Sequence, residues 1–511
     1  MKQTSPRGAI STSHHLATEA GAAALRAGGN AIDAALAAAA TLCVVYPHNV
    51  ALGGDLVALV HTPDGETRFL NATGTAPADQ TLTALREKHG DHLPVRGVDT
   101  VTVPGGIRGW QALHELGATR SWADHLEAAT RYAAEGVPVA HSLATGITDE
   151  QEPMLADPGC RQVFFRDGAP LAEGDLLRQP RLADTLRRLA ENGPDEFYTG
   201  ETAERWVSGL RALGSKISMS DAADYSADWG EPLEGAFRGH RVLTGPPNTS
   251  GFILLRALAA IEAGIEDPLG AGAGQLAEAL RAGNAVRAAS LADPRFGGAS
   301  GRELIDMPAP PYAPERELRP TGDTVGLSAA SSDGWAVSFI NSLFFRFGAC
   351  ILEPETGVLF QNRGTSFSLD PSSKNAFAGG KRPRHTLMPV LVMQGERLVW
   401  VPASMGGAGQ PQIHTHLLLR ALSGAEPAEV TSAPRWMVEE PAADGTVSVM
   451  VEEDVPAVAQ RAIEAQGLGL KSVPPHFEVL GHSNLIRIDD DGFTAASDPR
   501  SDGSAIVVDD A

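Results

Sequence analysis

Residues 319–334 read RPTGDTVGLSAASSDG, a turn-forming run followed at once by a strand pattern. The proline, glycine and aspartate of the first part are typical of turns, and residues 324–330 have the small and β-branched side chains of a strand. Thr324 is therefore predicted to open a strand. Threonine often begins a strand without any further role, and the local pattern alone favours that interpretation.

A cut before Thr324 would change the chemistry available at this point. A threonine hydroxyl is a poor nucleophile unless a base lies close by. If the bond between Asp323 and Thr324 were broken, the new α-amine, with a pKa of about 8, would lie on the same residue as the hydroxyl. Its neutral form could act as the general base, so that one residue supplied both nucleophile and base.

The composition describes a large globular protein. The chain has 511 residues, 43% of them hydrophobic and 20% charged, enough for one large layered domain or for several smaller ones. A net charge of −22 argues against nucleic acid and anionic membranes as partners. The three cysteines are widely spaced and fit neither a disulfide framework nor a zinc site. The N-terminus lacks the apolar core of a signal peptide, so we expect a cytoplasmic protein. We also expect neither a metal nor a cofactor.

The sequence divides into two parts of different texture, with the break just before Thr324. Upstream, apolar spacing predicts mainly helices, at residues 15–27, 31–45, 122–135, 181–192, 203–213, 251–263 and 275–292, with a hairpin at 56–61 and 67–71. Downstream, strands are predicted at 324–330, 336–342, 357–361, 387–394, 397–401, 477–479, 485–488 and 494–496, and helices at 412–422 and 455–466. The proline-rich residues 307–322 lack periodicity and are predicted to be a mobile connection.

Three further patterns have ordinary explanations. The run GAGAG at residues 270–274 follows a helix rather than a strand, which indicates a flexible linker and not a dinucleotide loop. His414 and His416 lie in a predicted helix, where residues two apart do not face each other, so no metal pair is expected. Residues 489–492, DDDG, are typical of a charged hairpin turn and lack the ligand spacing of a calcium loop.

A series of longer motifs runs in order through nearly the whole chain. They are GGNAIDAALAAAATLCVVYPHNVALGGDLVALV (28–60), VPGGIRGW (103–110), AAEGVPV (133–139), AENGPDEFYTG (190–200), GPPNTSGFILLRAL (245–258), LADPRF (291–296), KRPRHTLMP (381–389), SMGGAGQPQ (404–412), APRW (433–436) and DPRSDG (498–503). This ordered set resembles the gamma-glutamyltranspeptidase family. No single motif is decisive, but their order and spacing together are specific.

The resemblance implies the fold class of the chain and its processing from a precursor. It implies an α+β protein, a four-layer αββα sandwich of the N-terminal-nucleophile hydrolase type, made as one inactive precursor. Self-cleavage between Asp323 and Thr324 would give a large chain, residues 1–323, and a small chain, residues 324–511. The two would stay associated as one intertwined domain.

The resemblance also implies catalytic roles for particular residues. Thr324 occupies the place of the family's nucleophile, in a T-x-x-x-S strand whose serine is Ser328. Ser342, eighteen positions past Thr324, matches the hydroxyl residue that holds the nucleophile's oxygen. Gly406 and Gly407 match the glycine pair of the oxyanion hole, where each backbone N–H is typically worth about 3 kcal/mol.

The residues that bind glutamate in the family are replaced here. Thr73 stands where an arginine holds the substrate's α-carboxylate, and Phe344 and Ser366 stand where an asparagine and an aspartate bind the α-amino group. His385 and Thr386 replace two serines that contact the carboxylate. Neutral hydroxyls do not reproduce a bidentate arginine–carboxylate pair, so an ordinary γ-glutamyl substrate is not expected.

The remaining charges offer a different anion site. Arg363, His385 and Arg346 are each candidates to bind a substrate anion, and each could equally be a structural charge. Residues 367–381 form a short lid segment without the tyrosine that many bacterial members place over the substrate, so a more open pocket is expected.

We therefore expect a self-processing hydrolase that attacks a carbonyl of a small-molecule substrate through an acyl-enzyme. The resemblance offers two kinds of substrate: a small acyl amide such as oxamate, or an amide or carbon–carbon bond in a natural-product pathway such as the biosynthesis of alkylproline antibiotics. A γ-glutamyl hydrolase or transferase that uses Arg363 for the carboxylate is an alternative. An uncleaved binding scaffold is the alternative from another class, disfavoured by the presence of Thr324, Ser342 and the glycine pair.

Overall fold

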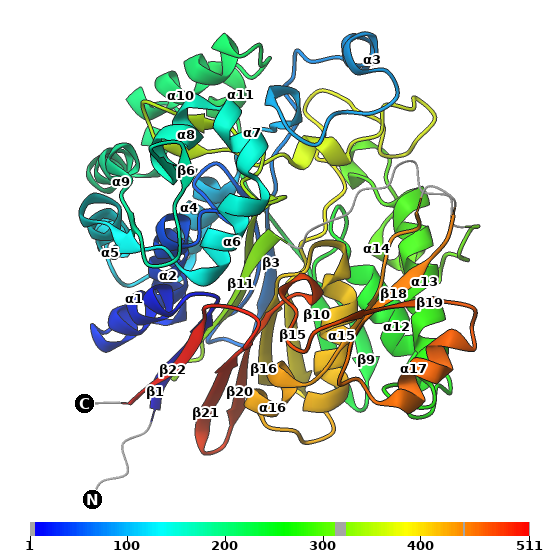
Figure 1. The fold of residues 1–511 in the computed structure, drawn as a ribbon. Helices are drawn as coiled ribbons and strands as arrows, with labels where there is room; N and C mark the ends of the chain where they lie inside the picture. The colour runs from blue at the N-terminus through cyan, green and yellow to red at the C-terminus, as the bar shows by residue number, and fades with distance from the viewer. Residues whose placement is uncertain (1–5, 312–322, 443–444, 510–511) are drawn as a thin grey trace, which may run out of the picture.

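Two antiparallel β-sheets packed face to face form the centre of the computed structural model, which describes residues 6–311, 323–442 and 445–509 (Figure 1). In order across the first sheet, the strands are β22 (Ser504–Asp509), β1 (Pro6–Thr12), β11 (Asp323–Ser331), β12 (Ala336–Phe344), β2 (Asp55–His61), β3 (Thr67–Ala72) and β8 (Asp228–Gly230). The second sheet is β21 (Gly492–Ser497), β20 (Ser483–Asp489), β16 (Arg397–Ser404), β15 (Val390–Gln394), β10 (His240–Thr244) and β9 (Leu233–Phe237). Strands from both sides of Thr324 contribute to each sheet.

The sheets are held together by apolar side chains that alternate along each strand. In β2, Val57 and Leu59 belong to the cluster between the two sheets, whereas Leu56, Ala58 and Val60 belong to the cluster under the helices. Alternation with a period of two sends successive side chains to opposite faces, so a strand with both faces covered is apolar throughout. All seven residues of β2 are buried accordingly.

Helices cover both outer faces (Figure 1). On the seven-stranded sheet lie α1 (His15–Arg26) and α2 (Ala31–Val45), with α5 (Trp122–Glu135) packed on α2. On the six-stranded sheet lie α12 (Gly251–Glu262) and α15 (Gln410–Ala421), with α13 (Ala273–Ser290) packed on α12 and α17 (Ala457–Glu464) packed on α13. Helix α2 is buried along its whole length, which its alanines permit because a small side chain lets neighbours approach closely. The four layers confirm the expected αββα sandwich.

The other elements are short or peripheral. The remaining helices are α3 (Leu82–His89), α4 (Gly106–Gly117), α6 (His141–Asp149), α7 (Gln151–Ala156), α8 (Pro158–Phe164), α9 (Pro180–Asn192), α10 (Glu201–Ala212), α11 (Met219–Ala223), α14 (Gly301–Asp306) and α16 (Pro427–Ser432). The remaining strands are β4 (Val137–Pro138), β5 (Phe165–Arg166), β6 (Ala169–Pro170), β7 (Leu176–Leu177), β13 (Leu352–Glu353), β14 (Val358–Leu359), β17 (Trp436–Val438), β18 (Ser448–Glu452) and β19 (Gly469–Val473). None of the helices in the described part of the chain is long and apolar enough to cross a membrane.

Most predicted elements are present, and a few predictions were wrong. Residues 477–479 were predicted as a strand but lie at a single 3₁₀ turn, Glu478–Leu480, just after His476 takes a positive φ of 57°. The strand predicted at 357–361 is reduced to the two residues of β14. Residues 312–322 of the predicted mobile connection lie outside the described residues.

Candidate active site

Thr324 lies near the start of β11, opposite a bulge in β12. Asp323 pairs with Phe344 and Val325 pairs with Asn341, so two residues of β12 oppose the single residue Thr324. A bulge of this kind commonly re-aims a side chain beside an active site. The bulge brings the hydroxyl oxygen of Ser342 to 2.9 Å from that of Thr324. The structure thus brings together the two hydroxyl residues predicted from the sequence.

The same serine hydroxyl contacts the peptide bond that precedes Thr324. Ser342 Oγ donates to the carbonyl oxygen of Asp323 at 2.9 Å and accepts the backbone N–H of Phe344 at 2.8 Å. A serine hydroxyl has one proton, and a carbonyl oxygen can only accept. The proton of the Thr324 hydroxyl therefore points to Ser342, and the Asp323 carbonyl is polarised by the serine.

The side chain of Asp323 is held by Arg346. The backbone N–H of Arg346 donates to one carboxylate oxygen at 2.8 Å and its Nε donates to the other at 3.0 Å. Its two terminal nitrogens bind Asp149 at 2.7 Å and Glu478 at 3.1 Å. Burial alone would lower the pKa of Arg346, but these three carboxylates raise it above its ordinary value. In the intact chain Arg346 is therefore a structural charge already bound to anions.

The predicted glycine pair lies in the turn between β16 and α15. Gly406 has a φ of 146° and Gly407 a φ of 50°, in the region that favours glycine. A Cβ atom on Gly406 would lie 2.2 Å from Cδ1 of Ile413, so no side chain fits there. The preceding Ser404 touches the backbone of β11 at Gly326, two residues from Thr324. The turn thus leaves β16 next to the strand that carries the threonine.

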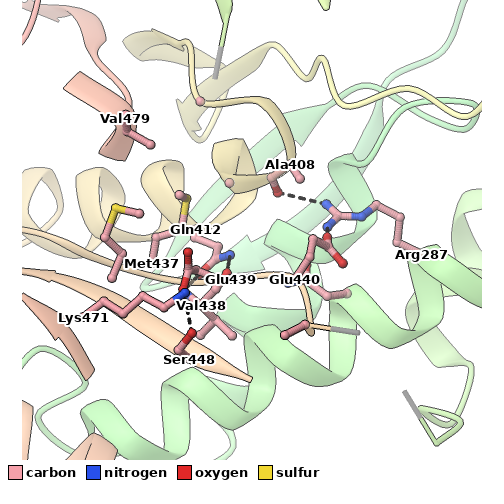
Figure 2. Close-up of a pocket in the computed structure, with 15 residues that line it drawn as sticks. Arg287, Ala408, Gln412, Met437, Val438, Glu439, Glu440, Ser448, Lys471 and Val479 are labelled. Carbon is pink, nitrogen blue, oxygen red and sulfur yellow. Dashed lines mark hydrogen bonds and ion pairs between the residues drawn. The ribbon is translucent and has the colours of Figure 1, made fainter. Parts of the chain in front are cut away.

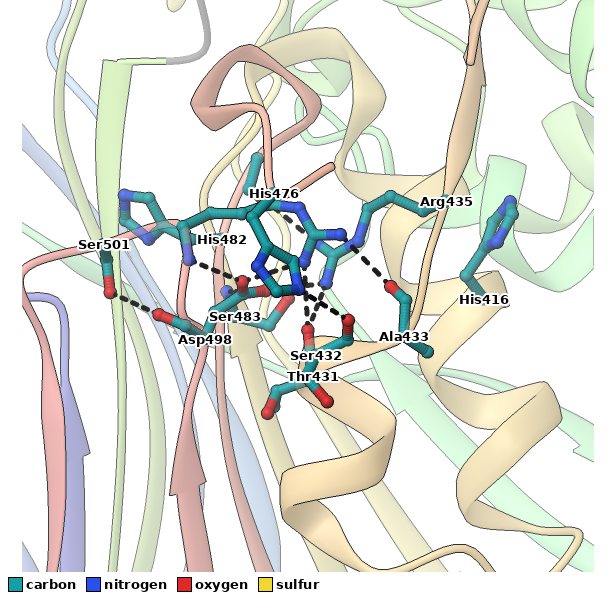
Figure 3. A network of polar contacts seen from close by, with 12 residues as sticks. His416, Thr431, Ser432, Ala433, Arg435, His476, His482, Ser483, Asp498 and Ser501 are labelled. Carbon is teal, nitrogen blue, oxygen red and sulfur yellow. Dashed lines mark hydrogen bonds and ion pairs between the residues drawn. The ribbon is translucent and has the colours of Figure 1, made fainter. Parts of the chain in front are cut away.

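A buried network of charges fixes the other side of this turn (Figure 3). Arg435 binds Asp498 at 2.6 Å and donates to the carbonyl oxygen of Gly481 at 3.1 Å, and Asp498 also accepts the N–H of Ser483 at 3.2 Å. The backbone N–H of Met405 donates to the carbonyl oxygen of His482, the residue between Gly481 and Ser483, at 2.9 Å. Removing one partner of a buried ion pair typically costs about 3–5 kcal/mol, so the network holds the glycine turn firmly.

A cavity of about 230 Å³ borders the glycine turn on its outer side (Figure 2). Both of its acidic side chains are paired: Glu440 with Arg287, and Glu439 with Lys471 at 2.6 Å. Arg287 also donates to the carbonyl oxygen of Ala408 in the turn, at 2.9 Å. This cavity could not be predicted from the sequence, because its lining comes from segments far apart in the chain.

Thr73, at the place of the family's arginine, is committed to local structure. Its hydroxyl donates to the side chain of Asn71 at 2.7 Å, and its N–H donates to the same oxygen at 3.1 Å. Nε of Arg382 donates to the carbonyl oxygen of Thr73 at 3.0 Å, and another of its nitrogens binds Asp228 at 2.5 Å. Neither Thr73 nor Arg382 reproduces the lost carboxylate contact.

His385 is paired with an aspartate that the sequence did not single out. Its Nε2 lies 3.0 Å from a carboxylate oxygen of Asp55, whose other oxygen accepts the N–H of Gly74 at 2.8 Å. The N–H of Leu387 donates to the Nδ1 of His385 at 3.3 Å, so the proton of the ring is on Nε2. Burial, followed by the nearby charge of Arg363, lowers the pKa of His385 to about 4. The imidazole is neutral at pH 7.

Arg363 lies in the same region, stacked on Phe344. Its guanidinium carbon is 3.6 Å from the centre of the Phe344 ring, and one terminal nitrogen donates to the hydroxyl of Thr386 at 3.2 Å. Burial lowers the pKa of Arg363 to about 9, which still leaves it charged at pH 7. Ser366 Oγ lies 2.8 Å from the carbonyl oxygen of Arg363 and 3.1 Å from that of Arg384.

Two asparagines beside the site were also missed. Asn49 donates to the carbonyl oxygen of Thr324 at 3.3 Å, while its own side-chain oxygen is buried without a hydrogen-bond partner among the residues that the structure describes. Asn341 donates to the carbonyl oxygen of Asp55, its near neighbour across β2 and β12, at 2.6 Å. The sequence did carry a signal for Asn49 and Asp55, since both lie in the long motif at residues 28–60.

The remaining sequence interpretations concern structural residues. Ser328 donates to the carbonyl oxygen of Asn484 at 3.0 Å and so joins the two sheets. His414 and His416 lie in helix α15 as predicted, and His414 is 3.0 Å from the hydroxyl of Ser404. Residues 489–492 form the predicted hairpin turn between β20 and β21.

The αββα sandwich, with a hydroxyl residue near the start of a central strand, defines the class of the fold as that of the N-terminal-nucleophile hydrolases. The chain belongs to the gamma-glutamyltranspeptidase family, whose model matches residues 17–508. It is 34% identical over 512 residues to the glutathione hydrolase-like YwrD proenzyme of Bacillus subtilis, covering 97% of each chain. It is 34% identical over 520 residues to the oxamate amidohydrolase proenzyme of Klebsiella pneumoniae, covering 96% of this chain and 97% of that one.

A solved structure supports the same relationship. The crystal structure of cephalosporin acylase from Bacillus halodurans aligns with a TM-score of 0.88 and 31% identity, over 98% of this chain and 96% of that one. The family and fold expected from the sequence motifs are thereby confirmed. The names of these relatives differ in the compound that they mention: glutathione, oxamate and cephalosporin.

Proposed function

We propose that the protein is a self-processing amidohydrolase in which Thr324 first cleaves the bond that joins it to Asp323 and then acts as the catalytic nucleophile. The observation that carries this proposal is the contact series from the Thr324 hydroxyl to Ser342 and from Ser342 to the Asp323 carbonyl, at 2.9 Å each. The nucleophile's proton has an acceptor, and the carbonyl to be attacked has a donor. The names of the two relatives, both proenzymes, support a processed enzyme.

Self-cleavage would proceed by attack of Thr324 Oγ1 on the carbonyl carbon of Asp323. The C–O bond forms as the C–N bond breaks, and the nitrogen of Thr324 takes up the proton that the hydroxyl gives up. Water then hydrolyses the resulting ester. The products are a chain ending in the α-carboxylate of Asp323 and a chain beginning with the free amine and hydroxyl of Thr324.

Turnover would use the same oxygen on an external amide. The neutral α-amine of Thr324 accepts the hydroxyl proton, Oγ1 attacks the substrate carbonyl, and the leaving amine departs with that proton. The N–H groups of the turn at Gly406 and Gly407 would stabilise the charge on the carbonyl oxygen. Water, deprotonated by the same amine, then releases the acid and regenerates Thr324. The buried side-chain oxygen of Asn49 is a suitable acceptor for the ammonium form.

Hydrolysis of γ-glutamyl compounds is the second candidate, favoured by the relative named as glutathione hydrolase-like. The replacements at Thr73, Phe344 and Ser366 favour a different acyl group, as do the relatives named as an oxamate amidohydrolase and a cephalosporin acylase. Carbon–carbon bond cleavage in a natural-product pathway would use the same nucleophile, but the amide-cleaving relatives favour an amide. Hydrolysis of a γ-glutamyl anilide by the processed protein would decide for the second candidate.

Intact-mass analysis of the purified protein tests the proposal. The wild type is expected to give two chains that meet at Asp323 and Thr324, and the Thr324→Ala variant one chain of 511 residues. Thr199→Ala, at an exposed threonine, is the matched control and should cleave like the wild type. A wild-type protein that stays whole after prolonged incubation refutes the mechanism.

A further inference from the structure

Arg363 is a buried cation with unused hydrogen-bond donors. Its side chain is 1% exposed, and within the described residues its Nε and one terminal nitrogen have no hydrogen-bond acceptor. The other terminal nitrogen donates to Thr386, and no carboxylate in the described parts of the chain forms an ion pair with it. A buried guanidinium without a hydrogen-bonded anion is costly, and structures retain such groups where a ligand completes them.

Asp55, the acidic residue whose charge acts on Arg363, does not bind its donors. Both carboxylate oxygens of Asp55 are already bonded, one to Gly74 and the other to the N–H of His385. Asp55 therefore offsets the charge of Arg363 at a distance, without binding its donors. His385 is neutral and contributes no second cation. Among Arg363, Asp55 and His385, only Arg363 therefore has charged N–H donors without an acceptor in the described part of the chain.

Arg363 is also close to the proposed nucleophile by direct contacts. Its guanidinium stacks on the ring of Phe344 at 3.6 Å, and the N–H of the same phenylalanine bonds to Ser342, which bonds to Thr324. Phe344 has a φ of 82°, in the left-handed region that non-glycine residues rarely adopt, at the end of the bulge in β12. One residue thus separates the cation from the hydroxyl pair.

We propose that Arg363 binds a carboxylate on the acyl part of the substrate, so that the substrate class is the monoamide of a dicarboxylic acid without an α-ammonium group. This inference rests on the proposed function of Thr324. Nε and the free terminal nitrogen lie on adjacent positions of the guanidinium and match the two oxygens of one carboxylate. The ring of Phe344 fixes the plane of the guanidinium.

The same residues disfavour an ammonium group. Phe344 offers no acceptor, and Ser366, at the place of the family's aspartate, already has its hydroxyl at the carbonyl oxygens of Arg363 and Arg384. An α-ammonium group would also lie near the positive charge of Arg363. A site with this charge selects glutaryl over γ-glutamyl, the two acyl groups differing only by that amine.

The test compares anilides that differ in one charge. Processed wild type is assayed with succinyl and glutaryl p-nitroanilides, with their neutral butyryl and valeryl counterparts, and with γ-glutamyl p-nitroanilide; oxamate is assayed by ammonia release. We expect kcat/KM to be at least about 30-fold higher for the carboxylated than for the neutral compounds, as a buried charge pair gives. Arg363→Gln should abolish that preference, mainly by raising KM for the carboxylated compounds.

Arg397→Gln, at an exposed arginine paired with Asp490, is the matched control and should keep the preference. Self-cleavage of Arg363→Gln, followed by mass, shows that this variant folds, and Arg363→Met, which also lacks the charge, replaces it as the test variant if it does not. Thermal shifts of processed wild type with succinate and glutarate supply a readout independent of turnover.

Each outcome decides one point. A wild type that does not cleave itself overturns the proposed function, and the inference with it. A processed enzyme that hydrolyses neutral and carboxylated anilides equally well overturns the inference alone, and so does the absence of both turnover and stabilisation with every carboxylated compound. Equal rates for glutaryl and γ-glutamyl anilides overturn the exclusion of the ammonium group.

Discussion

Replacing Arg346 by methionine should slow self-cleavage without changing the nucleophile. In the intact chain Arg346 holds the side chain of Asp323 through its backbone N–H at 2.8 Å and its Nε at 3.0 Å. Asp323 also carries the carbonyl that Thr324 is proposed to attack. A fixed side chain on this residue keeps the carbonyl directed at Ser342, so Arg346 acts as a positioning residue for the first reaction.

The magnitude follows from the contacts that are lost. The methionine variant keeps the backbone N–H bond to Asp323 and loses the one charge-assisted bond from Nε, worth about 1.5–3 kcal/mol. If that energy serves to hold the reactive geometry, self-cleavage slows by roughly 10- to 150-fold. Arg346→Lys retains the charge but lacks the planar fork that reaches three carboxylates, so its rate should fall between the two.

The assay is a time course of intact mass during incubation of freshly purified precursor. Asp149→Asn is the matched control, because Asp149 binds the same guanidinium but is half exposed and does not touch Asp323. Its cleavage rate should stay within about threefold of the wild type, as expected for an exposed pair. A thermal melt separates slow cleavage from misfolding. If folded Arg346→Met precursor cleaves at the wild-type rate, the assigned role of Arg346 is wrong.

Two further changes test the glycine turn and the buried histidines. Gly406→Ala should abolish turnover, because its Cβ would lie 2.2 Å from Ile413 at a φ of 146°; Gly395→Ala, at a positive φ with open space, should keep full turnover, and an active Gly406→Ala would contradict the assignment. Burial lowers the pKa of His414 from 6.5 to about 3, so the folded state binds fewer protons and this contribution to stability is lost as the pH falls below 6.5. Between pH 7 and pH 4.5, the free energy of unfolding of His414→Gln, measured with urea, should therefore fall by about 3 kcal/mol less than that of the wild type. Superimposable pH profiles of the two proteins would refute this.

Local patterns predicted the helices well because their signals lie within a few residues. Helix α5 begins and ends at Trp122 and Glu135, as predicted, since a serine cap and a following glycine mark its two ends. Strand β1 was missed because its small and polar residues show no alternation. Its identity as a strand depends on β11 and β22, which lie more than 300 residues further along the chain. Pairing at that separation leaves no local trace.

The candidate site likewise contains residues that could be predicted from the sequence and features that could not. Thr324, Ser342 and the glycine pair could be named from ordered motifs, because their spacing in the chain is fixed. The bulge in β12 and the positive φ of Phe344 depend on how two strands pair, and no residue type in the sequence predicts them. The pairing of His385 with Asp55 joins residues 330 positions apart, so the sequence left the role of His385 open.

In the proposed mechanism, the two buried arginines near Thr324 serve different reactions: Arg346 serves self-cleavage and Arg363 serves hydrolysis of the substrate. Arg346 is bound to three carboxylates, one of them on Asp323, in the chain before cleavage. Its binding capacity is thus used in the precursor. Arg363 has no such partner among the described residues, although it lies one phenylalanine away from the hydroxyl pair. In the proposed mechanism, an anion that binds Arg363 would come from the substrate, once Thr324 has turned from the bond at Asp323 to an external amide. The sequence offered both arginines as candidates for the anion site, and their different surroundings support assigning Arg346 to processing and Arg363 to substrate selection.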